Sequence, residues 1–216
     1  MAIILLIRHG ENDWVGNRLA GRLSDVHLNT TGLDQAKELA AKLENLPIKA
    51  IYSSPLERAV ETAQPLSVAK KLKITICDDL SEINFGDWQG KTIKQLRRLK
   101  LWKTVQDKPS QMQFPNGESF TDAQQRLVNC ITKISNDHET NDLIACFSHS
   151  DSIRLLVNYY LNMPLDCLQR IHINTASVSM LMLMKENISV PFVNLIETGT
   201  FIALFKEVND QPKKKS

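Results

Sequence analysis

The chain of 216 residues has few cysteines, little net charge and no long apolar run. Its four cysteines, Cys77, Cys130, Cys146 and Cys167, stand far apart and form no CxxC pair. Because Cys77 and Cys146 end apolar runs, we expect buried thiols in a reducing compartment rather than a disulfide framework. A formal net charge of +2 gives no reason to expect nucleic acid or a membrane surface as a partner.

The sequence also lacks internal repeats, low-complexity segments and any stretch that could anchor it in a membrane. Its apolar start, residues 2–7, is too short to span a bilayer and has no basic segment before it. We therefore expect a cytoplasmic protein without a signal peptide. Length and composition favour one domain, expected over residues 1–208, followed by a basic, flexible tail at 209–216.

Apolar runs alternate with amphipathic segments, which predicts an α/β domain of three layers, with a mainly parallel sheet flanked by helices. Strands are expected at 3–7, 50–52, 73–77 and 143–147, and a closing hairpin from 176–184 and 190–196 with its turn at 185–187. Helices are expected at 31–47, 55–70, 92–105, 119–134 and 151–160. Ser54, Pro55 and Glu57 predict a capping box at the start of the second helix.

Two of these strands end in a histidine, at the sheet edge where ligands bind in parallel sheets. His9 follows the first strand and His149 follows the strand at 143–147. Arg8 and Arg58 offer paired N–H donors to a phosphate, and helices that start after Ser54 and His149 add backbone N–H groups. A neutral imidazole can attack phosphorus, while a second, protonated histidine stabilises the transferring oxygens and a carboxylic acid protonates the leaving oxygen.

Other uses of these residues are weaker. A zinc or iron site would draw its ligands from His9, His149, Glu82 and Asp151, but the chain has no HxxxH or HExxH pair and the arginines would repel a divalent cation. We therefore expect no metal and no other cofactor. The basic stretch at 91–103, which includes Trp102, is explained by a solvated helix face without nucleic acid.

Five segments resemble motifs of the histidine phosphatase superfamily, in its phosphoglycerate-mutase-like branch. They run in the family's order from residue 8 to about 184: Arg8-His9-Gly10-Glu11; Ser53 to Ala59 with Thr62-Ala63; Leu80-Ser81-Glu82 with Gly86, Trp88 and Gly90; Pro115 to Ser119; and Ser148-His149. The resemblance implies the mainly parallel fold of that family and a reaction that uses no metal. It also implies roles for individual residues.

By this resemblance, His9 is the phosphorylated nucleophile, and Arg8, Arg58 and His149 form the phosphate pocket. Glu82 is then the proton donor to the leaving group and later the base that activates water. Asp151 is kept as an alternative acid, because another branch places its acid directly after the second histidine.

Two positions depart from the family's pattern. Val15 stands where the family usually has an asparagine that contacts phosphate, so Asn12 or Asn17 is a candidate substitute. Ser150 replaces the glycine that usually follows the second histidine, and its backbone N–H can still bind phosphate. Specificity is expected from the loops at 11–30, 83–90 and 105–118, with a lining that includes Gly21, Phe85, Trp102 and Phe114.

The resulting hypothesis is a metal-independent phosphatase of small phosphate monoesters, acting as a monomer or homodimer through phospho-His9. The resemblance also implies hydrolysis rather than a phosphoglycerate-type mutase, the alternative enzyme, because the family's mutases carry a longer insertion than this chain has between Glu82 and His149. A non-catalytic phosphate-binding domain is the alternative of a different class.

Overall fold

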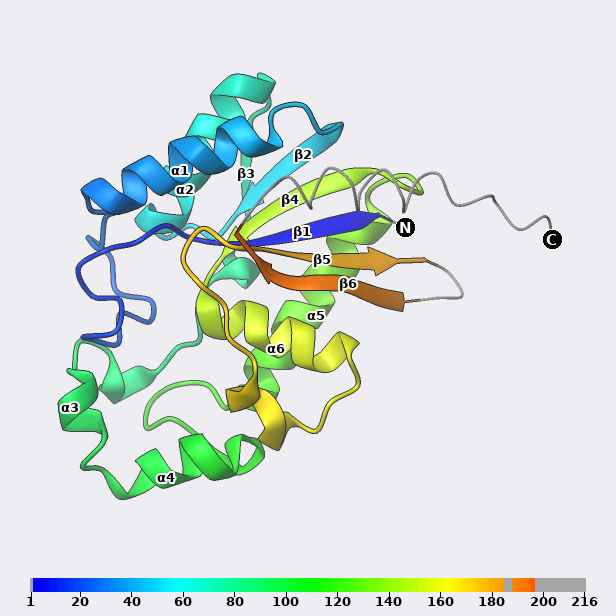
Figure 1. Ribbon diagram of the computed structural model, residues 1–216. Helices are drawn as coiled ribbons and strands as arrows, with labels where there is room; N and C mark the ends of the chain where they lie inside the picture. Colours follow the sequence, from blue (N-terminus) through cyan, green and yellow to red (C-terminus); the bar gives the residue numbers. More distant parts are fainter. Residues whose placement is uncertain (1, 185–187, 197–216) are drawn as a thin grey trace.

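The computed structural model describes residues 2–184 and 188–196, which form a six-stranded sheet between two layers of helices (Figure 1). The strand order is β3-β2-β4-β1-β5-β6. Parallel pairing joins β3, β2, β4 and β1, whereas β5 is antiparallel to β1 and β6 to β5. The strands are β1 (Ile3–Arg8), β2 (Ile48–Ser53), β3 (Ile74–Ile76), β4 (Leu143–Ser148), β5 (Val178–Leu183) and β6 (Ile188–Leu195). The predicted three-layer α/β fold is confirmed.

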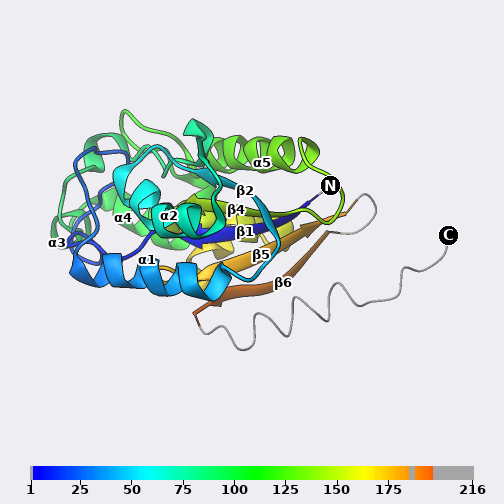
Figure 2. The same cartoon turned by 90° about the horizontal axis from the view of Figure 1, so that it is seen from above.

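β1 lies inside the sheet and is buried on both faces, which explains its continuous apolar sequence. Because side chains alternate along a strand, Ile3 and Leu5 enter one core and Ile4 and Leu6 the other. The first core contains residues of α1 (Thr30–Leu43) and α2 (Glu57–Lys70); the second contains residues of α5 (Phe120–Asn136) and α6 (Ser150–Tyr160). Figure 2 shows α1 and α2 in front of the sheet, with α5 on its other side.

The helical stretch expected at 92–105 is instead two short helices, α3 (Ile93–Leu96) and α4 (Lys100–Asp107). The break has a packing reason: Leu96 in α3 is fully buried in the second core, and Trp102 in α4 packs against the same core. A capping box between Thr92 and Gln95 fixes the start of α3. Both helices lie toward the carboxyl end of β1, at the lower left of Figure 1.

The capping box predicted at Ser54 is wrong. α2 begins only at Glu57, and its N-cap, Leu56, makes no side-chain cap bond. The hydroxyl of Ser54 instead accepts a bond from Leu56 N at 3.3 Å and lies 2.7 Å from His149 Nε2. Ser54 therefore contacts His149 at the carboxyl end of the sheet and does not cap the helix.

The closing hairpin is confirmed as the antiparallel pair β5 and β6. The proposed turn at 185–187 and the tail expected at 209–216 lie outside the described residues. Within residues 2–184 and 188–196, no helix combines the length and apolarity that a membrane span requires.

Candidate active site

His9 lies just beyond the carboxyl end of β1, with 5% of its surface exposed. Its Nδ1 is 2.7 Å from the carbonyl oxygen of Gly10. Since a carbonyl only accepts, Nδ1 carries the proton and Nε2 holds the free lone pair. Burial lowers the pKa of His9 well below its usual value, and the charges of Arg58 and Arg8 lower it further. The ring is therefore a neutral nucleophile near pH 7.

The backbone next to His9 is fixed by contacts from α1 and α2. Gly10 N donates to Thr62 Oγ1 at 2.9 Å, and that hydroxyl donates to the carbonyl of Arg58 at 2.6 Å. Gly10 also packs on the backbone of Gly32 in α1, so closely that a Cβ at Gly10 would lie 2.7 Å from the carbonyl oxygen of Gly32. Because both facing residues are glycines, the end of the strand can touch the helix. This contact fixes the backbone that orients the imidazole of His9.

Three donors around His9 are buried without a hydrogen-bond partner among the described residues: Arg8 Nε, Arg58 Nη1 and His149 Nδ1. The rest of each group is anchored: Arg8 Nη1 donates to Ile173 O, and Arg58 Nη2 to Gly21 O, each at 2.7 Å. Buried polar groups are rarely left unpaired, because desolvation without a partner costs roughly 1–3 kcal/mol each. Anchored arginines with unused donors are therefore suited to an anionic ligand.

His149 is fully buried as the N-cap of α6, and its ring centroid lies 5.3 Å from that of His9. Burial lowers its pKa well below the usual value, with further lowering by Arg58 and His9. The protonated second histidine expected from sequence is thus not its resting state. If Ser54 donates to Nε2, the neutral ring carries its proton on Nδ1, the nitrogen without a partner.

Glu82 is buried beside the start of α6, with 7% of its surface exposed. Its Oε1 accepts from Ile83 N at 3.1 Å, Ser152 N at 3.1 Å and Ser152 Oγ at 3.0 Å. Burial raises the pKa of Glu82 and the charge of Asp151 raises it further, while these hydrogen bonds and Arg58 oppose the shift. A carboxyl with a raised pKa close to a neutral histidine is the pairing that acid catalysis near neutral pH requires.

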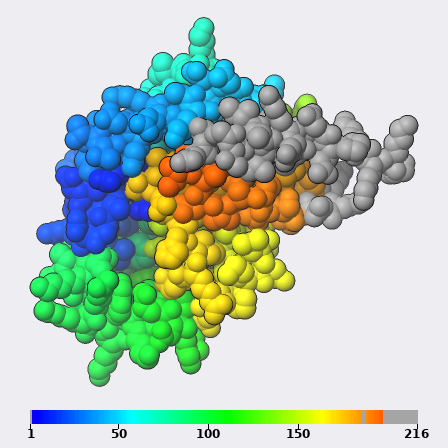
Figure 3. Space-filling model, in the orientation of Figure 1, coloured from blue at the N-terminus to red at the C-terminus, as the bar shows by residue number. Residues whose placement is uncertain are grey.

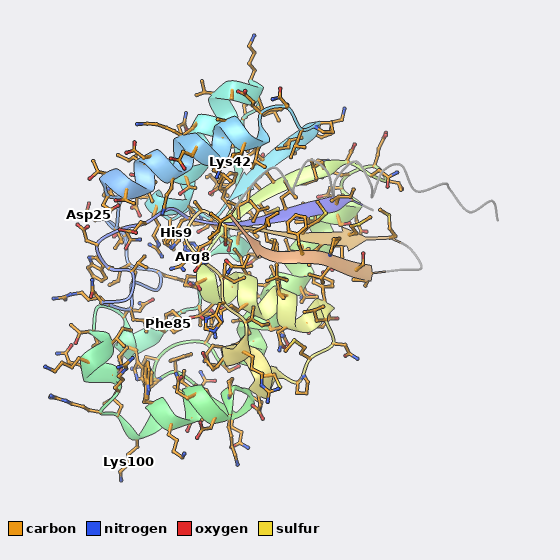
Figure 4. All side chains as sticks on the ribbon, viewed as in Figure 1. Arg8, His9, Asp25, Lys42, Phe85 and Lys100 are labelled. Carbon is orange, nitrogen blue, oxygen red and sulfur yellow. The ribbon has the colours of Figure 1, made fainter. Side chains whose placement is uncertain are left out.

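A pocket of about 170 Å³ opens over these groups. In Figure 4, Arg8 and His9 lie at the end of the sheet, and Phe85 lies between them and the two short helices. Of the residues expected from sequence, the pocket lining includes Arg8, His9, Asn12, Gly21, Arg58, Glu82, Phe85, Ser150 and Asp151. His149 lies behind the lining, next to His9.

Three expected residues lie elsewhere. Asn17 does not line this pocket, and its Nδ2 donates to Asp13 O at 3.3 Å on the exposed side of the loop. Trp102 stacks on Trp88 with ring centroids 6.3 Å apart, and Phe114 is 1% exposed. None of the three lines the catalytic pocket, because Asn17 faces the exposed side of the loop, Trp102 packs against the core and Phe114 is buried in it. Their role as substrate contacts stays a prediction.

Asp151 is placed differently from a second acid. Its Oδ1 accepts from Arg154 Nη1 at 2.6 Å, an ion pair one helical turn along α6. Asp151 is therefore engaged by Arg154, and its charge raises the pKa of Glu82. Glu82 remains the acid of choice.

Sequence reasoning missed the residues that hold the Glu82 segment. Arg22 Nε donates to the carbonyl of Glu82 at 2.8 Å, and Arg126 Nη1 to that of Ser81 at 3.2 Å. Both arginines meet on Glu118: Arg22 Nη2 at 2.9 Å, and Arg126 Nε and Nη2 at 2.9 and 3.1 Å. The acidic residue in the Pro115 to Ser119 motif was the available signal for this network. The pocket lining also includes Trp14, Arg18 and Ile93, for which the sequence offered no signal.

In the part of the chain that the structure describes, no cluster of three or more histidine, cysteine or acidic side chains is arranged to hold a metal ion.

The model of the family described as the histidine phosphatase superfamily (branch 1) matches residues 4–195. Phosphoserine phosphatase 1 of Hydrogenobacter thermophilus is 31% identical over 163 residues, which cover 72% of this chain and 74% of the relative. The 2,3-bisphosphoglycerate-dependent phosphoglycerate mutase of Thermoplasma acidophilum is 28% identical over 182 residues, covering 84% and 87%. The solved structure of mycobacterial glucosyl-3-phosphoglycerate phosphatase with VO3 matches with a TM-score of 0.80 at 25% identity, covering 89% of this chain and 98% of that one.

Proposed function

Because the chain belongs to branch 1 of the histidine phosphatase superfamily and is a phosphatase of that family, we propose that it hydrolyses small phosphate monoesters through a covalent phosphohistidine at His9, without a metal. One observation carries this proposal. Neutral His9 is surrounded by three buried donors, Arg8 Nε, Arg58 Nη1 and His149 Nδ1, that have no partner among the described residues. A phosphoryl group at His9 would give all three a partner.

In the first step, His9 Nε2 attacks phosphorus, and the bond from phosphorus to the ester oxygen breaks. Arg8 and Arg58 bind the equatorial oxygens, where charge-assisted bonds are strongest. His149 donates from Nδ1, and the approaching dianion raises its pKa and favours the protonated form expected from sequence. Glu82 gives its proton to the leaving oxygen, so that an alcohol rather than an alkoxide departs.

In the second step, Glu82 is a carboxylate and takes a proton from water as the water attacks phospho-His9. The bond between Nε2 and phosphorus breaks, inorganic phosphate leaves and Glu82 is again protonated. His9 keeps its proton on Nδ1 throughout, because that N–H donates a hydrogen bond to the carbonyl of Gly10.

We further propose that a single catalytic domain acts in the cytoplasm, as a monomer or homodimer. All groups used above come from one sheet and its connecting segments within residues 8–152, which supports one domain. The four cysteines are free, as a reducing compartment favours.

The test is release of phosphate from p-nitrophenyl phosphate, together with trapping of the phosphoenzyme by a rapid quench in alkaline denaturant. The wild-type protein should release phosphate and give an acid-labile, base-stable phosphohistidine, and His9→Ala should abolish both. His172→Ala, which removes an exposed histidine outside the pocket, is the matched control and should retain both. Equal turnover in wild type and His9→Ala would refute the mechanism.

A phosphoglycerate-type mutase is the second candidate function, because the relative from Thermoplasma acidophilum is named as such an enzyme. Isomerisation of 3-phosphoglycerate, primed with 2,3-bisphosphoglycerate and faster than phosphate release, would favour it. Phosphate-dependent thermal stabilisation without any turnover would favour a non-catalytic binding domain.

A further inference from the structure

A second hollow, of about 730 Å³, opens beside the catalytic pocket. The two share Gly16, Arg18 and Ile93 in their walls, so they lie next to each other. Four cations, Arg18, Lys94, Arg97 and Arg98, line the second hollow, which we call the basic groove. In Figure 3 the segment before residue 25 (blue) lies directly against the segment that follows residue 90 (green) on this face.

Backbone pairing holds these two segments together. Leu19 N donates to Lys91 O at 3.0 Å, and Ile93 N donates to Asn17 O at 2.9 Å. An isolated β-bridge joins Arg18 to Thr92 between them. The loop that follows His9 is therefore fixed to the start of α3, so the cations of the groove keep a defined position relative to the nucleophile.

The charges of the groove are uncompensated. The groove has no acidic residue in its wall, and no ion pair joins Lys94, Arg97 or Arg98 to any residue that the structure describes. Between Asp87 and Asp107 the chain has six basic side chains and no acidic one. Like charges held together raise the energy of the free protein and attract an anion.

Arg18 connects the two hollows. Its guanidinium lies 5.6 Å from the centroid of the Trp14 ring and donates from Nη1 to Gly90 O at 3.3 Å. One face of the guanidinium is thus held by an aromatic ring while the group remains exposed in both hollows.

Building on the proposed function, we propose that the substrate carries a second anionic group, a phosphate or a carboxylate, which binds in the basic groove while the scissile phosphate contacts His9. Arg18, Lys94, Arg97 and Arg98 are then specificity-determining residues. Both anions are recognised by the same chemistry, because guanidinium groups pair with either through parallel N–H donors.

The experiment compares matched substrate pairs that differ by one anion: fructose 1,6-bisphosphate against fructose 6-phosphate, and 3-phosphoglycerate against glycerol 3-phosphate. We expect wild-type kcat/KM to be higher for at least one doubly anionic member, by roughly tenfold at low salt. Removing Arg97 and Arg98 together, as Arg97→Gln/Arg98→Gln, should lower that preference roughly fivefold, mainly through KM, because each exposed pair contributes modestly. Raising the salt concentration should reduce the wild-type preference in the same direction.

Lys100→Gln is the matched control, because Lys100 is exposed on α4, lines neither hollow and lies at the outer edge of the molecule in Figure 4. It should leave the preference unchanged. The proposal is overturned if wild type shows no preference in either pair, or if the double variant and Lys100→Gln change it equally. A preference in the fructose phosphate pair would show that the groove binds a second phosphate, and a preference in the glycerate pair that it binds a carboxylate.

Failure of the proposed function gives a different result, namely no His9-dependent release of phosphate from p-nitrophenyl phosphate. The groove is then tested by calorimetry on the His9→Ala variant. The groove is supported if His9→Ala binds fructose 1,6-bisphosphate more tightly than fructose 6-phosphate. That difference should be lost in the triple variant, which combines His9→Ala with Arg97→Gln and Arg98→Gln. Equal binding of the two sugars would overturn it.

Discussion

Replacing Glu118 by glutamine would test how the acid Glu82 is held in place. Glu118 lies outside the catalytic pocket and receives Arg22 on one side and Arg126 on the other. Through them it fixes the carbonyls of Glu82 and Ser81. Glutamine keeps the shape of the side chain but removes its charge, so the two guanidinium groups lose their common counterion.

The magnitude follows from the burial of the three side chains. Glu118 and Arg126 are 20% and 17% exposed, and their pair is bidentate, so it contributes roughly 1.5–2 kcal/mol to the free energy of unfolding. Arg22 is 34% exposed, and solvent screening limits its pair to about 0.5–1 kcal/mol. The sum is about 2–3 kcal/mol, or roughly 4–12 °C in Tm for a chain of this size.

This loss should depend on pH. Burial alone raises the pKa of Glu118, but the hydrogen bonds from Arg126 and Asn84 N and the charges of Arg126 and Arg22 outweigh it and lower the pKa overall. A carboxyl with a lowered pKa contributes stability above its unfolded-state pKa and loses it as pH falls through the folded-state value. The difference in Tm between wild type and Glu118→Gln should therefore be largest near pH 7 and shrink below about pH 4.

The decisive assay compares leaving groups. A displaced Glu82 slows departure of an alcohol that needs a proton, and kcat/KM reports this first step. The kcat/KM for β-glycerol phosphate should therefore fall roughly 10- to 100-fold, while that for p-nitrophenyl phosphate, with its acidic leaving group, should change far less. Asp34→Asn, which removes an exposed acid paired with Lys37, is the control and should change neither rate nor Tm appreciably. Equal loss of kcat/KM for both substrates would show that Glu118 is only structural and would refute the reasoning.

Three further outcomes are expected. Glu82→Gln should be inactive on alkyl phosphates yet gain in Tm over wild type as pH rises, because a carboxyl with a raised pKa costs stability once it ionises; a Tm difference that is constant from pH 5 to 8 would contradict this. Gly32→Ala should lower Tm, by roughly 1–3 kcal/mol of unfolding free energy, and kcat as well, because the new methyl would overlap the carbonyl of Glu11; Leu33→Ala, at a 44% exposed position, is the control for both readouts. Mild peroxide should oxidise Cys77 and Cys130, whose sulfurs are 3.2 Å apart, to a disulfide with release of water, seen as a loss of two titratable thiols that Cys130→Ser prevents.

Much of the fold was predictable because its signals are local. β1 is an uninterrupted apolar run that ends at a cation and a histidine, and burial on both faces of a parallel sheet demands that pattern. The start of α5 was equally readable, since Ser119 caps it by accepting from Asp122 N at 3.0 Å. In both cases the cause and the sequence pattern lie within a few residues of each other.

The errors arose where a side chain has a distant partner. Ser54 has the spacing of a helix cap, but its hydroxyl contacts His149, 95 residues further along the chain. The split between α3 and α4 depends on a core that Leu96 and Trp102 both reach, which no helical periodicity reveals. Asn12 and Asn17 were equal candidates from sequence, and only the folded chain shows that Asn12 lines the catalytic pocket whereas Asn17 lines the basic groove beside it. Spacing identifies the residue type, but tertiary packing decides which way the side chain points.

The same reasoning explains how a proton donor can exist beside two arginines. Cations normally hold a carboxyl ionised, and Arg58 does lower the pKa of Glu82. Burial and the charge of Asp151 oppose it and prevail, while burial together with Arg58 and Arg8 keeps His9 unprotonated. The surroundings thus favour the neutral form of both the nucleophile and the acid. Asp151, first considered as a rival acid, acts on the reaction through the proton of Glu82, so removing its charge should shift the basic limb of the pH–rate profile to lower pH rather than abolish turnover.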